Sequence, residues 1–256
     1  MEEKDTSNIS YGKNAVLELL KSARNVDVLY ISEKDNSKQT NYYVALAKEK
    51  NATIKRVPSE KLEAVCLSNN HQGYVAVSSA IEYVEVEDIL EIARQKQENP
   101  FILLLDGIED SHNLGAIIRT AEVAGVHGLI IPKRRNIQIN PTVVRASTGA
   151  VHYLPIARVT NLASVVRQLK QLGIFCASSD MAGTNIYSQD LDIPLLLIIG
   201  SEANGVSHLL KQLSDYIISL PMAGKITSLN ASVAAGAIIY EVVRQRELPQ
   251  RRVAAT

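Results

Sequence analysis

From residue 100 onward, apolar positions follow two alternating spacings. Short, almost wholly apolar runs such as 101–105 and 193–199 are typical of strands covered on both faces of a sheet. Between the runs, apolar residues recur three or four positions apart, which predicts helices with one buried face. Strands are expected at 101–105, 128–131, 173–177, 193–199 and 216–220, and helices at 113–125, 142–147, 162–172, 205–213 and 231–243, with an extended segment at 152–156. The alternation predicts an α/β fold with a mostly parallel sheet and helices on both faces.

Residues 8–81 predict a smaller α/β domain. Helical patterns at 14–21, 41–50 and from Ser59 alternate with strand patterns at 26–31, 53–57 and 73–78. Residues 82–99 differ, because they carry six acidic and two basic side chains and precede Pro100, which discourages continuation of a helix. We therefore expect a domain at 8–81, an acidic linker at 82–99 with one short helical stretch, and a second domain at 100–247.

Composition favours a cytoplasmic globular protein. The 256 residues carry 27 basic and 27 acidic side chains, and a net charge of zero argues against a general nucleic-acid coat. No apolar stretch approaches the roughly 20 residues that cross a bilayer, and the acidic start is unlike a secretory signal. Cys66 and Cys176 lie far apart in apolar surroundings, which predicts free buried thiols. We expect no metal and no membrane association.

Polar residues follow three of the predicted strands. Asn113 and Arg119 come after the first strand of the second domain, Glu202 comes after the run at 193–199, and Ser228 and Asn230 come after the last strand. Doubly wound sheets bind their ligands at the carboxyl ends of the strands. We therefore expect these side chains to contribute to one site.

The loop at 220–230 leads into a helix that begins with small residues. Small residues let another backbone or a flat ligand approach closely, and Pro221 and Gly224 indicate that the turn has a required shape. Ser228 and Asn230 can cap the helix and still face a ligand. The pattern predicts a ligand-binding turn without identifying the ligand.

Each polar side chain has a structural and a functional interpretation. Asn113 is either a helix cap or a site residue. Arg119 is either a partner in a surface ion pair or, because its helix is otherwise apolar, a group that binds a planar anion. Glu202 is either a helix cap or the residue that orients Arg119. A lone loop histidine is more often incidental, so His112 is not assigned as a general base.

Three common fingerprints are missing from the sequence. No G-x-G-x-x-G follows a strand, which weakens the case for a nucleotide-dependent oxidoreductase. No G-x-x-x-x-G-K-[ST] and no G-x-S-x-G are present, so P-loop and α/β-hydrolase chemistry are excluded.

The three loops resemble the ordered motifs of the SpoU (TrmH) family of RNA ribose 2′-O-methyltransferases in the SPOUT superfamily. Segments 113–121, 199–205 and 220–230 carry the likeness, over about residues 100–247. Residues 11–20 and 71–76 are similar to the substrate-binding domain, akin to ribosomal protein L30e, of the branch that modifies a guanosine of 23S rRNA. One departure is Ser111, where the family often has a proline, so the loop entry lacks that fixed φ.

The resemblance implies a trefoil-knotted SPOUT domain of α/β class behind an L30e-like N-terminal domain. It implies S-adenosylmethionine bound in the knot, mainly by backbone groups. The implied cofactor-binding residues are Ile199, Gly200, Leu220 and Leu229, and the implied catalytic residues are Asn113, Arg119, Glu202, Ser228 and Asn230. It also implies a homodimer that completes the site with residues from both subunits.

The expected reaction is methylation of a ribose 2′-hydroxyl in RNA, with a guanosine of 23S rRNA as the leading substrate. A tRNA ribose methyltransferase is the alternative within the family, and a non-catalytic RNA-binding ribosome-assembly factor is the alternative outside it. The presence of all five polar residues favours an enzyme. A guanidinium is a poor base, since its pKa lies above about 12, so we expect Arg119 to bind an RNA phosphate and stabilise the reacting oxygen.

Overall fold

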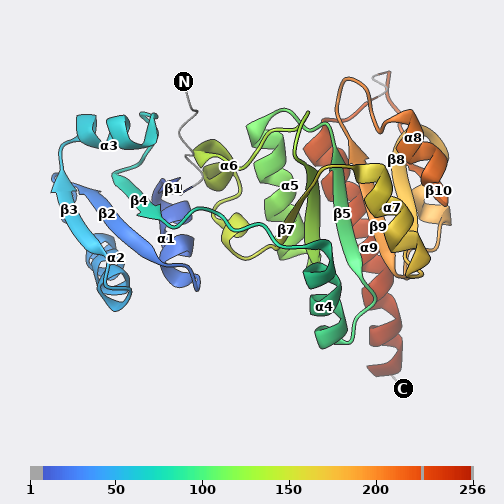
Figure 1. Cartoon of the computed structure of the whole chain (residues 1–256), viewed down its shortest axis with the longest axis horizontal. Helices are drawn as coiled ribbons and strands as arrows, with labels where there is room; N and C mark the ends of the chain where they lie inside the picture. The colour runs from blue at the N-terminus through green and yellow to red at the C-terminus, as the bar shows by residue number, and fades with distance from the viewer. Residues whose placement is uncertain (1–7, 226–227, 255–256) are drawn as a thin grey trace. The chain divides into compact units, whose positions relative to one another are not determined.

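The computed structural model describes residues 8–225 and 228–254, with side chains described as far as Glu247. Contacts between Cα atoms divide the chain into two compact units (Figure 1). The first unit runs to Glu82 and resumes with Gln138–Tyr153, and the second takes Tyr83–Ile137 and the residues from Leu154 onward. Each unit is therefore built from two separate stretches of sequence.

A four-stranded mixed sheet forms the centre of the first unit. Its order is β1 (Ile9–Tyr11), β4 (Tyr74–Ser78), β2 (Val26–Ser32) and β3 (Thr53–Val57). Only β2 and β3 pair in parallel. Side chains alternate along β4, so that Tyr74 and Ala76 join one apolar cluster while Val75 joins another. Residues of α1 (Lys13–Lys21) and α2 (Lys38–Glu49) fill the first cluster, and those of α3 (Ser59–Cys66) the second.

The segment that returns to the first unit carries α6 (Pro141–Ala146) and the 3₁₀ turn η1 (Ala150–His152). Tyr153 donates its hydroxyl to the Glu18 backbone oxygen at 3.0 Å, and His152 Nε2 lies 3.3 Å from Ser10 Oγ. Gly149 has φ +88, and a Cβ there would lie 2.6 Å from the Glu18 Cβ. The apolar pattern predicts an extended segment at 152–156, but these contacts with distant residues hold the chain in a turn, and strand β7 is Ile156–Val159.

A six-stranded sheet forms the centre of the second unit. All of its pairs are parallel, in the order β10 (Tyr216–Ser219), β8 (Phe175–Asn185), β9 (Leu195–Gly200), β5 (Phe101–Asp106), β6 (Gly128–Pro132) and β7. Every residue of β9 is buried, as are the first five of β5. The nearly continuous apolar runs are explained by this burial on both faces, as the sequence predicts.

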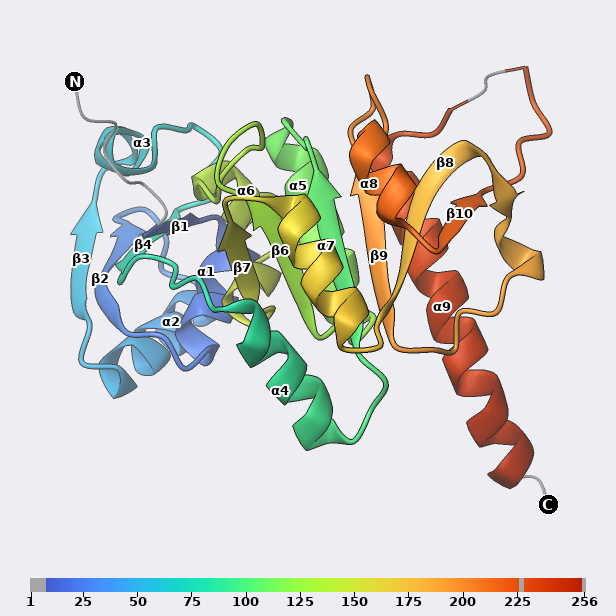
Figure 2. The same cartoon turned by 45° about the vertical axis from the view of Figure 1, so that its right-hand side comes forward.

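Helices cover both faces of this sheet (Figure 2). One face packs against α4 (Val86–Lys96), α7 (Leu162–Gln171) and α8 (His208–Leu213), whose apolar residues share a cluster with Ile102, Leu104 and Ile198. The other face holds α5 (Ser111–Val123) and α9 (Ala231–Ala254), which contact each other. The α/β class with a parallel sheet is therefore confirmed.

The stretch expected as an acidic linker forms α4 and packs on the second unit. Val86, Ile89 and Ala93 are its buried residues, and its charged residues face outward. A Cβ at Gly128 would lie 2.6 Å from the Ile89 side chain, so this glycine makes room for the helix. Among the helices of the described part of the chain, none is both long and apolar enough to cross a membrane.

Candidate active site

Three of the residues singled out from sequence meet at the ends of β5 and β9. Asp106 and Gly200 are paired at the carboxyl ends of these neighbouring strands. Just beyond them, Asn113 Nδ2 donates to Glu202 Oε1 at 3.2 Å, and Asn230 Nδ2 donates to Asn113 Oδ1 at 2.9 Å. Asn230 Nδ2 also donates to Glu202 Oε1. We call Asn113, Glu202 and Asn230 the amide–carboxylate cluster.

The cluster is positioned by the ends of two helices. Asp110 Oδ1 accepts from the Asn113 backbone N–H at 2.8 Å and caps α5, so Asn113 lies inside the first turn and is not itself the cap. Asn230 Oδ1 accepts from Ser232 N at 3.0 Å and Val233 N at 3.3 Å, which caps α9. The side-chain oxygen of Asn230 therefore caps α9, while its NH₂ group makes the hydrogen bonds of the cluster.

Glu202 sits at the amino end of α9. Its Oε1 accepts from the Ala231 backbone N–H at 3.1 Å as well as from the two amides of the cluster. A carboxylate is favoured there because the first N–H groups of a helix lack partners and carry partial positive charge. Of the two interpretations of Glu202, the structure supports the contact with a helix end. It also shows a hydrogen bond from Asn113 to Glu202.

Arg119 lies apart from this cluster. No hydrogen bond or ion pair joins Arg119 to Glu202 in the described residues, so the role of Glu202 in orienting Arg119 stays a prediction. Six residues along an α-helix place side chains about 120° apart around the axis and about 9 Å apart along it. Arg119 is accordingly exposed on the face of α5 that also exposes His112 and Val123.

The backbone around position 200 leaves no room for a side chain, so only glycine fits there. Gly200 is buried, and a Cβ on it would fall 2.0 Å from the Gly205 carbonyl carbon. The loop turns back tightly here, since Gly205 N donates to Ser201 O at 2.9 Å. Gly224 is different, because among the described residues a Cβ there would meet nothing within 4 Å, and its φ is not positive. The shape requirement expected of Gly224 is therefore not present, and the tight position is Gly200.

The remaining predicted residues border the loop between β10 and α9. Ile199 is buried at the end of β9, Leu220 is half-buried, Leu229 is 41% exposed, and Ser228 is exposed. Within the described residues, the backbone of 220–225 and 228–229 makes no hydrogen bond to the protein. Free N–H and C=O groups beside apolar side chains fit the adenosyl part of S-adenosylmethionine, which needs edge hydrogen bonds and apolar contact.

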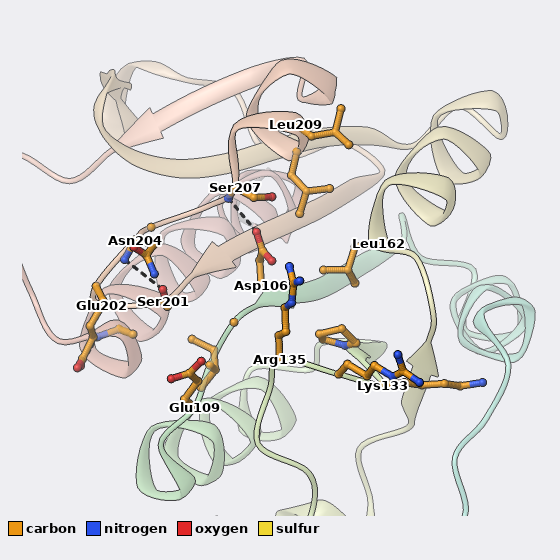
Figure 3. Close-up of a pocket in the computed structure, with 18 of the residues that line it drawn as sticks. Asp106, Glu109, Lys133, Arg135, Leu162, Ser201, Glu202, Asn204, Ser207 and Leu209 are labelled. Atoms are coloured by element: carbon orange, nitrogen blue, oxygen red, sulfur yellow. Dashed lines mark hydrogen bonds between the residues drawn. The ribbon is translucent and has the colours of Figure 1, made fainter.

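A cavity of about 1000 Å³ lies beside the cluster (Figure 3). Asn113 and Glu202 line one end of it, together with Ala231 at the start of α9. Asp106 lines it too, and its Oδ2 accepts from the Ser207 backbone N–H at 2.8 Å. Sequence reasoning did not select Asp106, although an acidic residue ending a buried apolar strand is a recognisable signal.

Comparisons with known proteins cover both units. The family described as SpoU rRNA Methylase matches residues 100–240, and the family described as RNA 2′-O ribose methyltransferase substrate binding matches residues 9–84. YacO of Bacillus subtilis (strain 168), assigned to the TrmH family of tRNA/rRNA methyltransferases, is 47% identical over 236 residues, which are 92% of this chain and 94% of YacO.

Two solved structures with bound AdoMet also resemble this chain. The SpoU methyltransferase AviRb from Streptomyces viridochromogenes has a TM-score of 0.78 and 28% identity, covering 93% of this chain and 90% of AviRb. The rRNA methyltransferase from Sinorhizobium meliloti has a TM-score of 0.77 and 26% identity, covering 93% of this chain and 87% of that protein.

Proposed function

Because the chain belongs to the SpoU family of RNA 2′-O-ribose methyltransferases, which use S-adenosylmethionine, we propose that it methylates a guanosine ribose in 23S rRNA. The observation that carries the catalytic part is the amide–carboxylate cluster, which joins the three predicted loops. The match of residues 9–84 to a substrate-binding family supports an RNA substrate. The match of residues 100–240 to a family described as SpoU rRNA Methylase and the likeness to an rRNA methyltransferase support the choice of rRNA.

Bound S-adenosylmethionine supplies a methyl group that is already activated as a sulfonium. The residues of the chain must then align the ribose oxygen and favour its attack. In the balanced reaction the 2′-oxygen forms the new bond to carbon, the carbon–sulfur bond breaks, and the hydroxyl proton passes to a neighbouring phosphate or to water. Backbone groups of 220–225 and 228–229 are the proposed holders of the cofactor.

Arg119 is proposed to bind the phosphate next to the reacting ribose. Its guanidinium is exposed and has no ion pair or side-chain hydrogen bond in the described part of the chain, so its donors are available for a bidentate contact. The same contact stabilises negative charge that develops on the 2′-oxygen. The amide–carboxylate cluster and Ser228 are proposed to position the loops and the substrate.

A homodimer would bring a second subunit to Arg119. The exposed residues of α9 include Val233, Ala237 and Tyr240, which are spaced to share one helix face, and Val123 of α5 is 66% exposed. Apolar side chains gathered on adjacent helices favour burial against another protein surface. We propose that this face is covered by a second copy of the chain, and that the last helix is part of a trefoil knot as in the SPOUT superfamily.

Arg119→Lys tests whether the planar guanidinium of Arg119, with its paired N–H donors, is needed. Lysine keeps the charge but cannot make a planar bidentate contact, so we expect a loss of turnover of at least about 100-fold, the scale measured when one charge-stabilising donor is removed from an active site. S-adenosylmethionine affinity, measured by calorimetry, should be unchanged. Arg167→Lys on the outer face of α7 is the matched control and should keep full turnover.

Substrate choice is tested by mapping ribose methylation in RNA from cells that lack the protein. Loss of one methyl group in 23S rRNA, restored by the wild type but not by Arg119→Ala, is the expected result. A lost methyl group in tRNA would favour the alternative substrate. Unchanged methylation of all RNA, with the purified protein inactive on rRNA, would favour the non-catalytic assembly factor.

A further inference from the structure

The cavity beside the cluster lies at the ends of β5 and β9, where the chain leaves two neighbouring strands toward opposite faces of the sheet. The loop after β5 leads to α5 on one face of the sheet, whereas the loop after β9 leads to α8 on the other. Diverging loops at neighbouring strand ends leave a crevice at such a switch point. The cofactor and Arg119 roles proposed above use one end of this space at most, since the cavity extends to the ends of β6 and β7.

One wall of the cavity is basic. Lys133, Arg134 and Arg135 line it, are exposed, and make no ion pair or side-chain hydrogen bond within the described ranges. Their loop is fixed at both sides, because Lys133 N donates to Val159 O at 2.8 Å and Ile137 N donates to Ile108 O at 2.8 Å. Unpaired cations on a fixed backbone suit a phosphate.

Arg135 has a backbone conformation that residues other than glycine rarely adopt. Its φ is +59, and a non-glycine residue held in the left-handed region costs about 1–3 kcal/mol. Ile108 N donates to Asn136 Oδ1 at 2.8 Å, which ties the loop to the end of β5. Such strain clusters where a side chain is directed to a ligand, and Figure 3 shows Arg135 reaching toward the side chain of Asp106.

The opposite wall is apolar with a few acceptors. Leu162 of α7 and Leu209 of α8 line the cavity, and Leu209 is 48% exposed. Between them and Arg135, Asp106 keeps one carboxylate oxygen without a hydrogen bond from the described residues, because only its Oδ2 receives Ser207 N. A leucine surface suits the face of a base, and a carboxylate oxygen suits an N–H donor on its edge.

We propose that this crevice binds a nucleotide of the RNA next to the methylated one. Its phosphate contacts Lys133 and Arg135, its base packs on Leu162 and Leu209, and a base N–H donates to Asp106. Glu109, Asp110 and Glu202 line the far edge of the cavity, so the phosphate is confined to the basic wall. A volume of about 1000 Å³ has room for a whole nucleotide. This inference rests on the proposed methyltransferase function.

The test compares the full-length wild type with a Lys133→Ala, Arg135→Asn double variant. Asparagine tolerates the left-handed backbone at 135, so the loop shape should be kept. The substrate is a 23S rRNA transcript that contains the mapped methylation position. We expect the KM for RNA to rise at least tenfold while kcat and S-adenosylmethionine affinity stay within twofold. The salt slope of RNA binding should fall by about 0.7, the amount for one phosphate contact on a single strand.

Two further variants separate this inference from general charge effects and from misfolding. Arg167→Ala removes one cation outside the cavity and should leave the KM and the salt slope unchanged. Asp106→Asn keeps an acceptor for Ser207 N and should raise the KM several-fold with the same thermal midpoint. An active wild type together with an unchanged KM in the double variant overturns the proposed nucleotide site. A wild type that transfers no methyl group to any RNA overturns the proposed function instead.

Discussion

At the scale of single residues, Glu202 and Asn230 each stabilise a helix end and also form part of the site. Glu202 accepts from Asn113, Asn230 and the first N–H of α9, while the other side of the Asn230 amide caps that helix. Sequence reasoning selected all three residues of the cluster. It could not decide the pairing of Glu202, since spacing along the chain does not tell which of two exposed side chains lies on the facing side of a helix.

Replacement of Asn230 separates its two roles. Asn230→Ala removes both the cap and the amide, so we expect a loss of about 1 kcal/mol of stability and a fall of about 2–4 °C in the thermal midpoint, together with loss of methyl transfer. Asn230→Ser keeps a capping oxygen but has no N–H₂ for the cluster. It should melt close to the wild type and still be inactive. Full activity of the serine variant in a methyl-transfer assay would contradict a role for the amide.

At the scale of elements, the end of β9 is the tightest part of the site. The strand continues into a loop that folds back over Gly200, and the α9 residue Ala231 reaches the same loop through Glu202. The buried strands were predictable because burial on both faces leaves only apolar residues. The ends of helices were less predictable. Helix α5 begins at Ser111, two residues before the predicted 113, with Asp110 as its cap, and the turn at 201–205 delays the start of α8 to His208.

Replacement by alanine should change the free energy of unfolding at one glycine of the site and leave it unchanged at another. At Gly200 the added methyl would overlap the Gly205 and Val206 backbone, so we expect destabilisation of at least about 1–3 kcal/mol, as for an overpacked core. At Gly224 the methyl meets no described atom within 4 Å, so the free energy of unfolding should stay within about 0.5 kcal/mol of wild type. Urea unfolding of both variants measures this, and equal losses would refute the close approach at Gly200.

At the scale of the whole molecule, the first unit depends on a segment from the middle of the chain. Residues 138–153 pack on β1 and α1, although sequence reasoning assigned them to the second domain. Patterns of apolar residues identify helices and strands but not the partner against which a short helix packs. The trefoil knot and the dimer likewise came from resemblance, because neither leaves a local signal, and both stay predictions.

His152 makes the stability of the first unit depend on pH. Burial, with a smaller contribution from Arg24, lowers the pKa of His152 from its ordinary 6.5 to about 3. The unfolded chain therefore binds a proton between these values that the folded chain does not, so stability falls as the pH drops from 6.5. From pH 7 to 5 we expect a loss of about 2 kcal/mol, at about 1.4 kcal/mol per pH unit. Urea unfolding of wild type and His152→Gln should show the difference between them shrink over this range.

A mixture of two inactive variants tests whether the proposed dimer shares its sites. If Arg119 acts at the site of the partner subunit, a dimer of Arg119→Ala with Asn230→Ser has one intact site. Random reassociation of equal amounts then restores about a quarter of the wild-type methyl transfer. If Arg119 acts at its own site, the mixture stays inactive. A protein that is monomeric by light scattering would contradict the dimer itself.

The split origin of the first unit also sets an order of events during synthesis. At 5–20 residues per second, the ribosome spends about 3–11 s on residues 83–137 before the segment 138–153 begins to appear. During that interval Ser10 and Glu18 lack the partners they later find in His152 and Tyr153. The first unit therefore closes only after β5 and β6 of the second have been made, so the nascent chain assembles its two units in overlapping steps and not one after the other.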